Sequence, residues 1–401
     1  MYEWYYMLVM NIPFVDLSRQ PKKLHTTIHE KLKNVIGKGN FILGHEVGEF
    51  EDAFAKYLGV KHCVGLASGT DAILLSLMAL GLKEGDEVIV PAMTFIASVA
   101  PLIHLRIKPV FVDIASDIVN IDVTRIEKAI TKKTKAIIPV HLHGFPADMN
   151  AIMDIAHRYK LFVIEDAAQA HGALIKCKML NAKCKIETQK YTSKKRDEEN
   201  NWKKVGTIGD IGCFSFYPSK NLGAWGDAGA LVTKSDEIAG RVRLLRDHGQ
   251  EAKYVHSILG YNSRLDTIQA VVLSAKLSYL DFWNKKRRQT AQLYSQRLRD
   301  LPVVLPAELV GTRAIYHVYQ IRTKLRDQLH AYLIKQGIHT SFHYPIPLHL
   351  QPALKFLGYK KGSFPVSERF ADETLSLPMF PYLSHREVRF VANYIHRFSD
   401  D

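Results

Sequence analysis

The chain has 401 residues, of which 47% are hydrophobic and 23% are charged, as is typical of a globular protein with one large and one smaller domain. No apolar run reaches the ~20 residues that cross a bilayer, and the start "MYEWYYMLVMNIPF" lacks the basic segment and small-residue cleavage site of a signal peptide, so we expect neither membrane contact nor secretion. The net charge of +14 would suit a nucleic-acid-binding protein. However, much of the excess lies within residues 176–205, which hold nine lysines and one arginine against four acidic residues. The rest of the sequence has no basic stripe, so no nucleic-acid partner is predicted.

The first two-thirds of the chain alternate short β-branched runs with longer amphipathic segments. The expected strands cover residues 62–67, 87–91, 108–113, 135–140, 161–166, 212–216 and 229–233. The expected helices between them include residues 70–81, 94–105, 122–130 and 148–159. This alternation predicts an α/β domain around a largely parallel sheet that is covered on both faces.

The remainder predicts a smaller α+β domain behind a long, charged connecting helix. Its expected elements are strands at 316–322 and 339–344 and helices at 324–336, 366–374 and 385–398. The predicted division is therefore a large domain at 10–263, a connecting helix at 264–300 and a small domain at 301–401. Residues 174–205 are polar and aperiodic, which predicts a flexible insertion, and Met10 is an alternative first residue.

The cysteines show no spacing typical of a metal site or of a disulfide framework. They are Cys63, Cys177, Cys184 and Cys213. We therefore predict reduced thiols, a cytoplasmic location and no metal site.

Polar residues follow the predicted strands repeatedly, and in a parallel sheet such positions meet at one edge, where ligands bind. The residues at these positions, with Gly69 and Phe95 beside the polar ones, are Ser68, Gly69, Thr70, Thr94, Phe95, His141, His143, Asp166, Gln169, His171, Ser215 and Lys220.

Lys220 stands in "GCFSFYPSKNLGAWGDAGALVT", just past a buried strand. A P-loop needs glycine directly before its lysine and a hydroxyl residue directly after it, whereas Ser219 and Asn221 flank this one, so that interpretation fails. A lysine used in covalent chemistry and an amine that reaches solvent from a turn both stay open on these residues alone.

Three further features match the needs of pyridoxal phosphate. Asp166 at a strand end suits a protonated ring nitrogen, although a helix N-cap would use the same residue type. "ASGTDAILLSLMALG" leads from small residues into a helix, whose N-terminus suits a phosphate group. Phe95 suits stacking on a ring, or ordinary core packing. With Lys220 for a Schiff base, these residues supply the parts that the cofactor requires.

The chain resembles the DegT/DnrJ/EryC1/StrS family of sugar aminotransferases. The resemblance rests on five motifs in family order and extends over nearly the whole chain. The motifs are "SGTDA", "PAMTFIAS", "EDAAQAHGA", "SFYPSKNLGAWGDAGALVT" and "GYNSRLDTIQA". It implies the fold of the type I pyridoxal-phosphate-dependent transferases, which is like that of aspartate aminotransferase.

The resemblance also implies a role for each matching residue. Lys220 would hold the cofactor and then act as general base and acid, while Asp166 would pair with the pyridinium nitrogen. Gln169 would contact the ring hydroxyl and Phe95 would stack on the ring. The phosphate would be held by Gly69, Thr70 and Ser215, and by Asn262 from the partner subunit of an obligatory homodimer. The sugar site would include His343, Tyr344, His349 and Gln351.

The implied reaction moves the amino group of L-glutamate, through pyridoxamine phosphate, to a nucleotide-linked keto-sugar for polysaccharide biosynthesis. "GYNSRLD", "NLGAWGDAG" and "PIPLHLQP" resemble members that aminate the C3 ketone of a dTDP- or UDP-linked deoxysugar, whereas members that aminate C4 more often have an aromatic residue at position 263. A C4 aminotransferase and a non-catalytic member remain alternatives. His143 and the long 174–205 segment depart from the family pattern.

Overall fold

The computed structural model describes residues 10–177 and 201–400. Its centre is a seven-stranded sheet in the order β1-β9-β8-β5-β4-β2-β3. The strands are β1 (His62–Leu66), β2 (Glu87–Pro91), β3 (Lys108–Val112), β4 (Thr134–Ile137), β5 (Phe162–Asp166), β8 (Ile211–Ser215) and β9 (Gly229–Thr233). All neighbouring pairs are parallel except those that β9 makes with β1 and β8. The seven predicted strands and the largely parallel sheet are confirmed.

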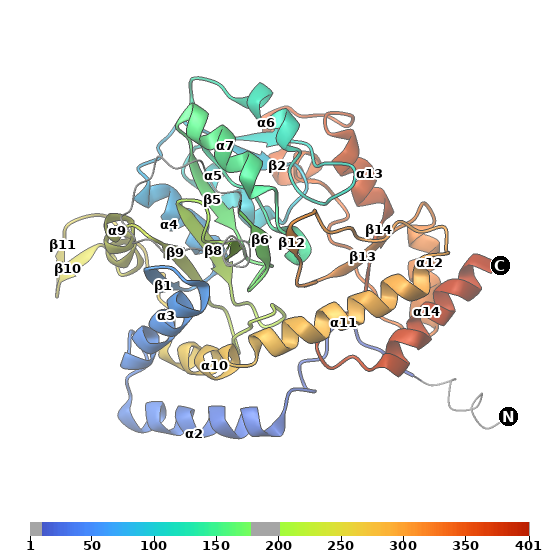
Figure 1. Ribbon diagram of the computed structural model, residues 1–401. Coiled ribbons are helices and arrows are strands. Elements are labelled where there is room, and N and C mark those ends of the chain that lie inside the picture. The colour runs from blue at the N-terminus through green and yellow to red at the C-terminus, as the bar shows by residue number, and fades with distance from the viewer. Residues whose placement is uncertain (1–9, 178–200, 401) are drawn as a thin grey trace, which may run out of the picture.

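Helices cover both faces of this sheet, because its strands are apolar on both sides. One face packs on α3 (His45–Leu58), α7 (Met149–Tyr159) and α10 (Thr267–Leu277), with α6 (Val123–Ala129) at the margin. The other face packs on α4 (Gly69–Ala79), α5 (Ala100–His104) and α9 (Asp236–Arg246). Figure 1 shows the sheet between these layers, with α2 (Lys22–Lys38) lying across the bottom.

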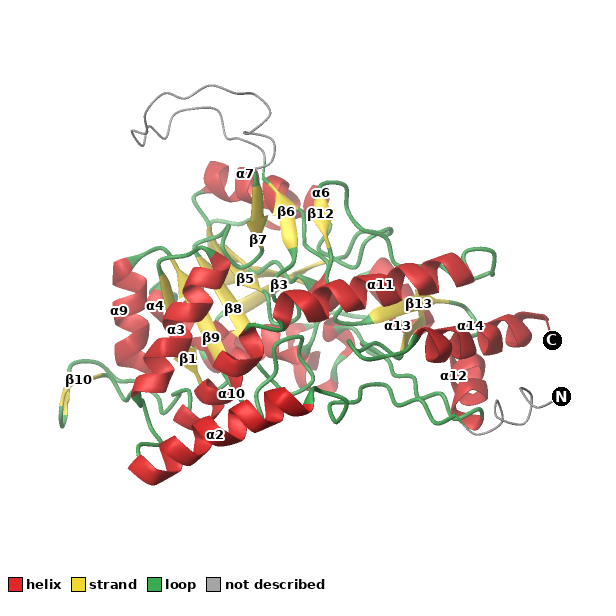
Figure 2. Cartoon of the chain, turned by 60° about the horizontal axis from the view of Figure 1, so that its bottom comes forward, coloured by secondary structure: helices red, strands yellow, loops and turns green. Residues whose placement is uncertain are grey.

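A separate hydrophobic cluster lies at the C-terminal end of the chain. It joins α11 (Leu280–Leu298), β13 (Tyr319–Arg322), α12 (Arg326–Lys335), β14 (Thr374–Leu377) and α14 (His385–Asp400). α13 (Pro365–Glu373) packs instead on the large sheet's second cluster, through Phe370 and Ala371. Figure 2 shows α11 running from the sheet layers towards this cluster. The residue boundaries of the two domains stay a prediction.

The structure corrects four predicted elements. Residues 94–105 form a short 3-10 turn (Ile96–Ser98) and α5 rather than one helix, because the backbone of Val99 (φ −121°) departs from helical angles and Pro101, which lacks an N–H, lies in the first turn of α5. Residues 264–300 form two helices, α10 and α11, with a break at 278–279 where the chain leaves the sheet layers. Residues 339–344 form only one isolated bridge, from Ser341 to Ser376. The predicted strand 316–322 begins at Tyr319.

The ends of the predicted 174–205 insertion are regular structure. β6 (Leu174–Lys176) pairs with β7 (Trp202–Lys204) and with β12 (Thr312–Arg313), and Ile175 is buried. The prediction of flexibility is wrong for these strands, because pairing satisfies their backbone groups. For residues 178–200, which include Cys184, the prediction lies outside the described residues, as does that for residues 1–9. Among the residues the structure does describe, we find no helix with the length and apolar character needed to span a membrane.

Candidate active site

A cavity of about 470 Å³ lies at the carboxyl ends of the parallel strands, as the sequence predicts. Segments following β1, β2, β5 and β8 form its floor, and residues 317 and 343–344 close it from the C-terminal part of the chain. Nine of the predicted site residues line it: Gly69, Thr70, Phe95, Asp166, Gln169, Ser215, Lys220, His343 and Tyr344.

Lys220 lies in a tight turn after β8, where its backbone N–H donates to Tyr217 O (2.8 Å). The turn needs Gly223, because a Cβ there would lie 2.2 Å from Pro218 O. Among the described residues the Lys220 amine makes no hydrogen bond, and the residue lines the cavity. Burial lowers its pKa to about 8, although the charge of Asp166 partly offsets this effect. A lysine with these properties suits nucleophilic chemistry near neutral pH.

Asp166 ends β5 with both carboxylate oxygens fixed. Ser98 Oγ donates to Oδ2 (2.7 Å) and Ala168 N donates to Oδ1 (3.1 Å), while Thr94 Oγ1 lies 3.0 Å from Ser98 Oγ. The alternative of a helix N-cap is wrong, because residues 167–173 form turns rather than a helix. The carboxylate that these hydrogen bonds hold lines the same cavity as Lys220.

The N-terminus of α4 forms an anion cup in the cavity wall. Ser68 caps the helix by accepting from Asp71 N (3.1 Å), so the first amide groups of the helix stay available. The chain approaches closely here: a Cβ on Gly69 would lie 2.7 Å from Ser215 Cβ, and one on Gly229 would lie 2.2 Å from Ser68 C. Small residues therefore bring the α4 N-terminus and Ser215 together, in an arrangement that suits a phosphate.

Gln169, Phe95 and Tyr344 also line the cavity. Gln169 Oε1 accepts from His143 N (2.6 Å), and Gln169 Nε2 donates to Tyr344 OH (3.0 Å). The rings of Phe95 and Tyr344 have centroids 5.5 Å apart. Because 51% of Phe95 is exposed, the alternative that it is an ordinary core residue is wrong.

Three predicted residues lie elsewhere in this single chain. Asn262 is exposed beside Asp247, outside the cavity. His349 is buried with its Nε2 2.8 Å from Glu368 Oε1, and Gln351 Nε2 donates to Ile346 O (3.2 Å). The structure therefore does not bring His349 and Gln351 to the predicted sugar site, because local hydrogen bonds hold both side chains.

Comparison with known proteins identifies the family to which the chain belongs. A model of the DegT/DnrJ/EryC1/StrS aminotransferase family matches residues 22–396. The chain belongs to this family. A Geobacillus stearothermophilus relative named "Pleiotropic regulatory protein" is 45% identical over 97% of this chain and 99% of its own length. The UDP-N-acetyl-3-dehydro-α-D-glucosamine 3-aminotransferase of Acidithiobacillus ferrooxidans is 42% identical over 96% of this chain and 97% of its own length.

A solved structure gives the same result for the fold. DesV of S. venezuelae, solved in complex with a ketimine intermediate, matches with a TM-score of 0.90 and 39% identity, covering 98% of this chain and all of that one. The predicted DegT/DnrJ/EryC1/StrS family and its aminotransferase fold are confirmed.

Ser98 and His317 are among the cavity residues that sequence reasoning missed. Ser98 is the polar residue that interrupts an apolar segment, and His317 interrupts a strand-like run. Each interruption is a weak indication in the sequence that the residue lies at a site. His143, noted as a departure from the family, is fully buried, and neither of its ring nitrogens has a hydrogen-bond partner among the residues that the structure describes. Burial, followed by the charge of His343, lowers its pKa to about 3, so His143 is a neutral residue behind the cavity wall.

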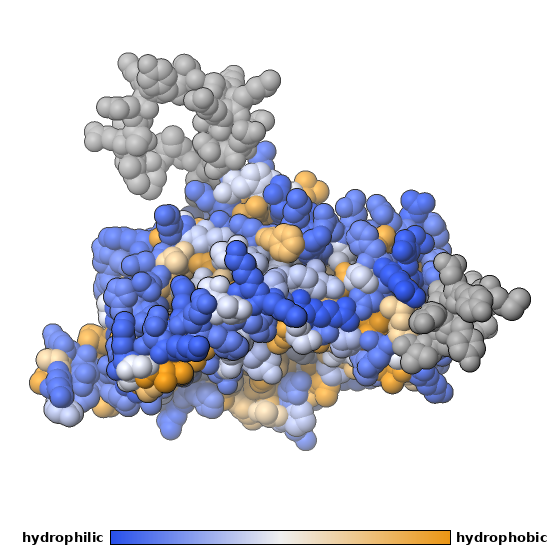
Figure 3. Space-filling view, turned by 90° about the horizontal axis from the view of Figure 1, so that it is seen from below, coloured by the Kyte–Doolittle hydropathy of each residue, from blue (hydrophilic) through white to orange (hydrophobic). Residues whose placement is uncertain are grey.

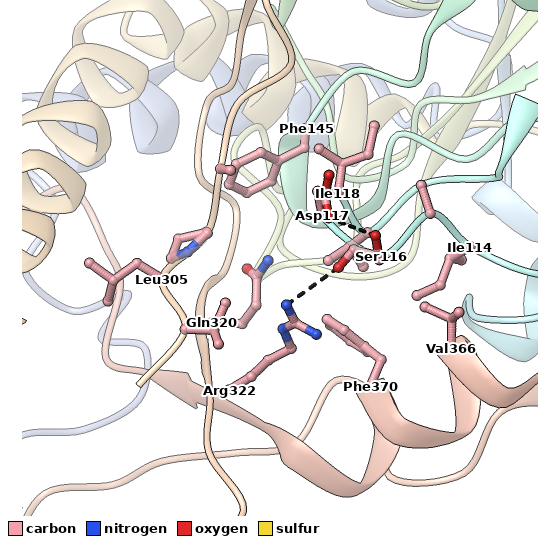
Figure 4. Close-up of a pocket in the computed structure, with 15 residues that line it drawn as sticks. Ile114, Ser116, Asp117, Ile118, Phe145, Leu305, Gln320, Arg322, Val366 and Phe370 are labelled. Atoms are coloured by element: carbon pink, nitrogen blue, oxygen red, sulfur yellow. Dashed lines mark hydrogen bonds between the residues drawn. The ribbon is translucent and has the colours of Figure 1, made fainter. Parts of the chain in front are cut away.

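A second crevice shares no lining residue with the Lys220 cavity. It lies between residues 114–119 and the β13 region, and its volume of about 20 Å³ has room for roughly one water molecule. Figure 4 shows its polar groups engaged with one another: Arg322 donates to Ser116 O (3.4 Å), and Ser116 Oγ donates to Asp117 Oδ1 (2.6 Å). This crevice is too small to be the family's substrate site.

Proposed function

We propose that this protein transfers the amino group of L-glutamate to the C3 ketone of a dTDP- or UDP-linked keto-deoxysugar, with pyridoxal phosphate as its cofactor. One observation carries the proposal: a lysine amine without a hydrogen-bond partner among the described residues, a hydrogen-bonded aspartate and a helix N-terminus line one cavity. The product would be an amino sugar for polysaccharide biosynthesis. A cytoplasmic location belongs to the same proposal, and the three described free cysteines are consistent with it.

The residues present fit the cofactor. The α4 N-terminus, with Thr70 and Ser215, would hold the phosphate, and small residues leave the space that it needs. Asp166 would hold the ring nitrogen protonated, Gln169 would contact the ring hydroxyl and Phe95 would lie against the ring. When bound, pyridoxal phosphate supplies an electron sink for the carbon that loses its proton.

Lys220 would carry out the proton transfers of the reaction. Because the pKa of the amine is about 8, a substantial fraction of it is neutral near pH 7.5. The neutral amine can accept a proton from the substrate carbon and then donate it again, as the 1,3-proton shift of a transamination requires. Tyr344 is held beside Gln169, and burial raises the pKa of Tyr344, so its hydroxyl stays a neutral donor at the cavity wall.

The names of the relatives support C3 as the site of amination. The Acidithiobacillus relative is named as a 3-aminotransferase, and a Streptomyces venezuelae relative, 39% identical, is named dTDP-3-amino-3,4,6-trideoxy-α-D-glucose transaminase. Ser263 fits the same assignment, because it is buried and its Oγ donates to Asp71 Oδ2 (2.8 Å), which leaves little space for the aromatic residue of C4 enzymes.

A non-catalytic regulator is the second candidate, favoured by the name of the Geobacillus relative. Lys220 and its surroundings favour catalysis instead, because the lysine lines the same cavity as Asp166 and the N-terminus of α4, an arrangement that a purely structural role does not require.

A homodimer with shared active sites completes the proposal. The hairpin of β10 (Gln250–Ala252) and β11 (Val255–His256) projects from the body in Figures 1 and 2. In its turn 81% of Tyr254 is exposed, and in the segment after it 92% of Leu259 is exposed. The face seen from below in Figure 3 also carries separate hydrophobic patches. These surfaces suit contact with a second copy, whose Asn262 would then reach this chain's phosphate cup.

The purified protein with L-glutamate and a panel of 3-keto and 4-keto nucleotide sugars tests the reaction. We expect a yellow protein, formation of 2-oxoglutarate and amination of the 3-keto sugars, with Lys220→Ala reducing turnover by about 10²- to 10⁴-fold. Conversion of 4-keto sugars alone would make the C3 assignment wrong. Full activity of the lysine variant would refute the catalytic role.

Mixing two inactive variants tests the shared site. Lys220→Ala and Asn262→Ala damage different halves of one composite site, so subunit exchange should restore roughly a quarter of the wild-type activity. Light scattering should give a mass near twice 45.5 kDa. Heterodimers that form, as seen by native mass spectrometry, but stay inactive would contradict the sharing.

A further inference from the structure

His317 lies at the junction of two cavities. The Lys220 cavity adjoins an outer cavity of about 640 Å³ that the chain's first described residues, including Asn11 and Phe14, help to line. The two cavities share the side chains of Tyr217, Ser219, His317 and His343. A ligand that extends from the outer cavity to Lys220 would therefore lie against this group of residues, which includes His317.

A chain of buried amides fixes the tautomer of this histidine. Asn284 Nδ2 donates to His171 O (2.8 Å), which leaves Asn284 Oδ1 to accept from Asn221 Nδ2 (2.8 Å). Asn221 Oδ1 then faces His317 Nδ1 at 3.1 Å, so Nδ1 must be the donor. Because a backbone carbonyl can only accept, it sets both amide orientations, and the lone pair of the neutral imidazole lies on Nε2.

The position and charge of the ring are equally constrained. The backbone N–H of His317 donates to His143 O (2.9 Å). Burial first, and then the positive charge of Lys220, lower the pKa of His317 well below its usual value. Nε2 has no hydrogen-bond partner among the described residues and is not enclosed by them. It is therefore a hydrogen-bond acceptor at neutral pH, on a residue that lines both cavities.

We propose that His317 is a specificity-determining residue for the acceptor substrate, because its Nε2 accepts a hydrogen bond from a hydroxyl group of the keto-sugar. The proposal rests on the proposed function. A lone pair attracts a hydroxyl donor and repels a carboxylate, so His317 should favour the sugar and contribute little to the binding of glutamate. Asn221 and Asn284 are positioning residues that act through the ring.

The two half-reactions separate these effects. In His317→Phe the ring keeps its size and loses both nitrogens, so we expect a three- to tenfold higher KM for the keto-sugar, the range for one lost neutral hydrogen bond. The single-turnover rate with glutamate, followed by the cofactor's absorbance, should stay within about threefold of wild type. His317→Gln, which returns an acceptor near the position of Nε2, should recover part of the sugar KM.

A matched control and a direct measurement complete the test. His330 also hydrogen-bonds through Nδ1, to Thr340 Oγ1 (2.6 Å), but lines neither cavity, so His330→Phe should leave both half-reactions unchanged. In ¹⁵N NMR of the wild type, the signals that His317→Phe removes should show a neutral Nδ1–H ring from pH 5 to 9, and Asn284→Ala should admit the other tautomer.

The outcomes distinguish the two proposals. If the wild type fails to convert glutamate with any keto-sugar, the proposed function fails and the role of His317 fails with it. If the wild type is active but His317→Phe keeps the wild-type sugar KM, or slows both half-reactions equally, only the role of His317 is overturned. An Nε2–H tautomer in the NMR spectrum would overturn it as well.

Discussion

The cavity walls remove the amino group of Lys220 from bulk water, which lowers its pKa from 10.5 to about 8 although the Asp166 carboxylate pulls the pKa upward. Only the neutral amine attacks an aldehyde, so the apoprotein should react with a small uncharged aldehyde about tenfold faster at pH 7 than at pH 6, with a plateau above pH 8. Borohydride trapping and peptide mass spectrometry measure this rate at Lys220.

Asp166→Asn gives the matched control for this titration. Removing the carboxylate removes the charge that raises the lysine's pKa, so the midpoint should move below 8. A midpoint near 10.5 in the wild type would contradict the burial of the amine, and an upward shift in the variant would contradict the attraction between the two groups.

Residue positions were predictable from the sequence where topology alone decides them. Asp166 and Lys220 follow strands of a parallel sheet, and the carboxyl ends of such strands must meet. His349 shows the limit, because its hydrogen bond to Glu368 depends on how the 3-10 turn Leu348–Leu350 packs against α13. Ser98 was missed for the same reason: its hydrogen bond to Asp166 joins elements 68 residues apart.

At the scale of elements, Glu165 holds the loop that enters β8. Its carboxylate points to the face of β5 opposite Asp166, where it accepts from Gly206 N, Ile208 N, Gly209 N and His141 Nε2 at 2.6–3.0 Å. In Glu165→Gln the amide NH₂ would meet these donors, so we expect a loss of roughly 3 kcal/mol in the free energy of unfolding, measured in urea.

An exposed ion pair provides the comparison for Glu165. Glu84 Oε2 lies 3.3 Å from Arg106 Nη1, and most of both side chains is exposed. Glu84→Gln should therefore change the free energy of unfolding by less than about 1 kcal/mol. Equal effects of the two substitutions would mean that the buried carboxylate does not hold the loop.

Elements were predictable where hydrophobic periodicity reflects burial. All five residues of β2 are buried, and its apolar run identified it directly. The apolar spacing of 264–300 continues across the break between α10 and α11, so the sequence does not reveal where the helix turns away from the sheet. Residues 339–344 have a strand-like pattern, yet the structure gives them one bridge, because β14 pairs along its length with β13.

At the scale of the whole molecule, the segment between β6 and β7 separates the Asp166 motif from the Lys220 motif along the chain but not in space. β5 and β8, which end at these motifs, are hydrogen-bonded neighbours, with Asp166 opposite Cys213. β6 and β7 pair as a hairpin whose ends meet, since Cys177 N donates to Asn201 O (3.0 Å). The sheet therefore fixes the site independently of the length of chain between these two residues.

Replacing residues 178–200 with an Asn-Gly turn should accordingly leave the free energy of unfolding within about 1 kcal/mol and leave cofactor absorbance and turnover nearly unchanged, because a two-residue turn closes such a hairpin. Removing all of 174–205 should instead destabilise the protein by roughly 2–5 kcal/mol, since that deletion takes away the buried side chains of Ile175 and Val205. Urea denaturation and the assay with glutamate measure both variants. Loss of bound cofactor in the shorter deletion, with the fold intact, would mean that residues 178–200 contribute to the site.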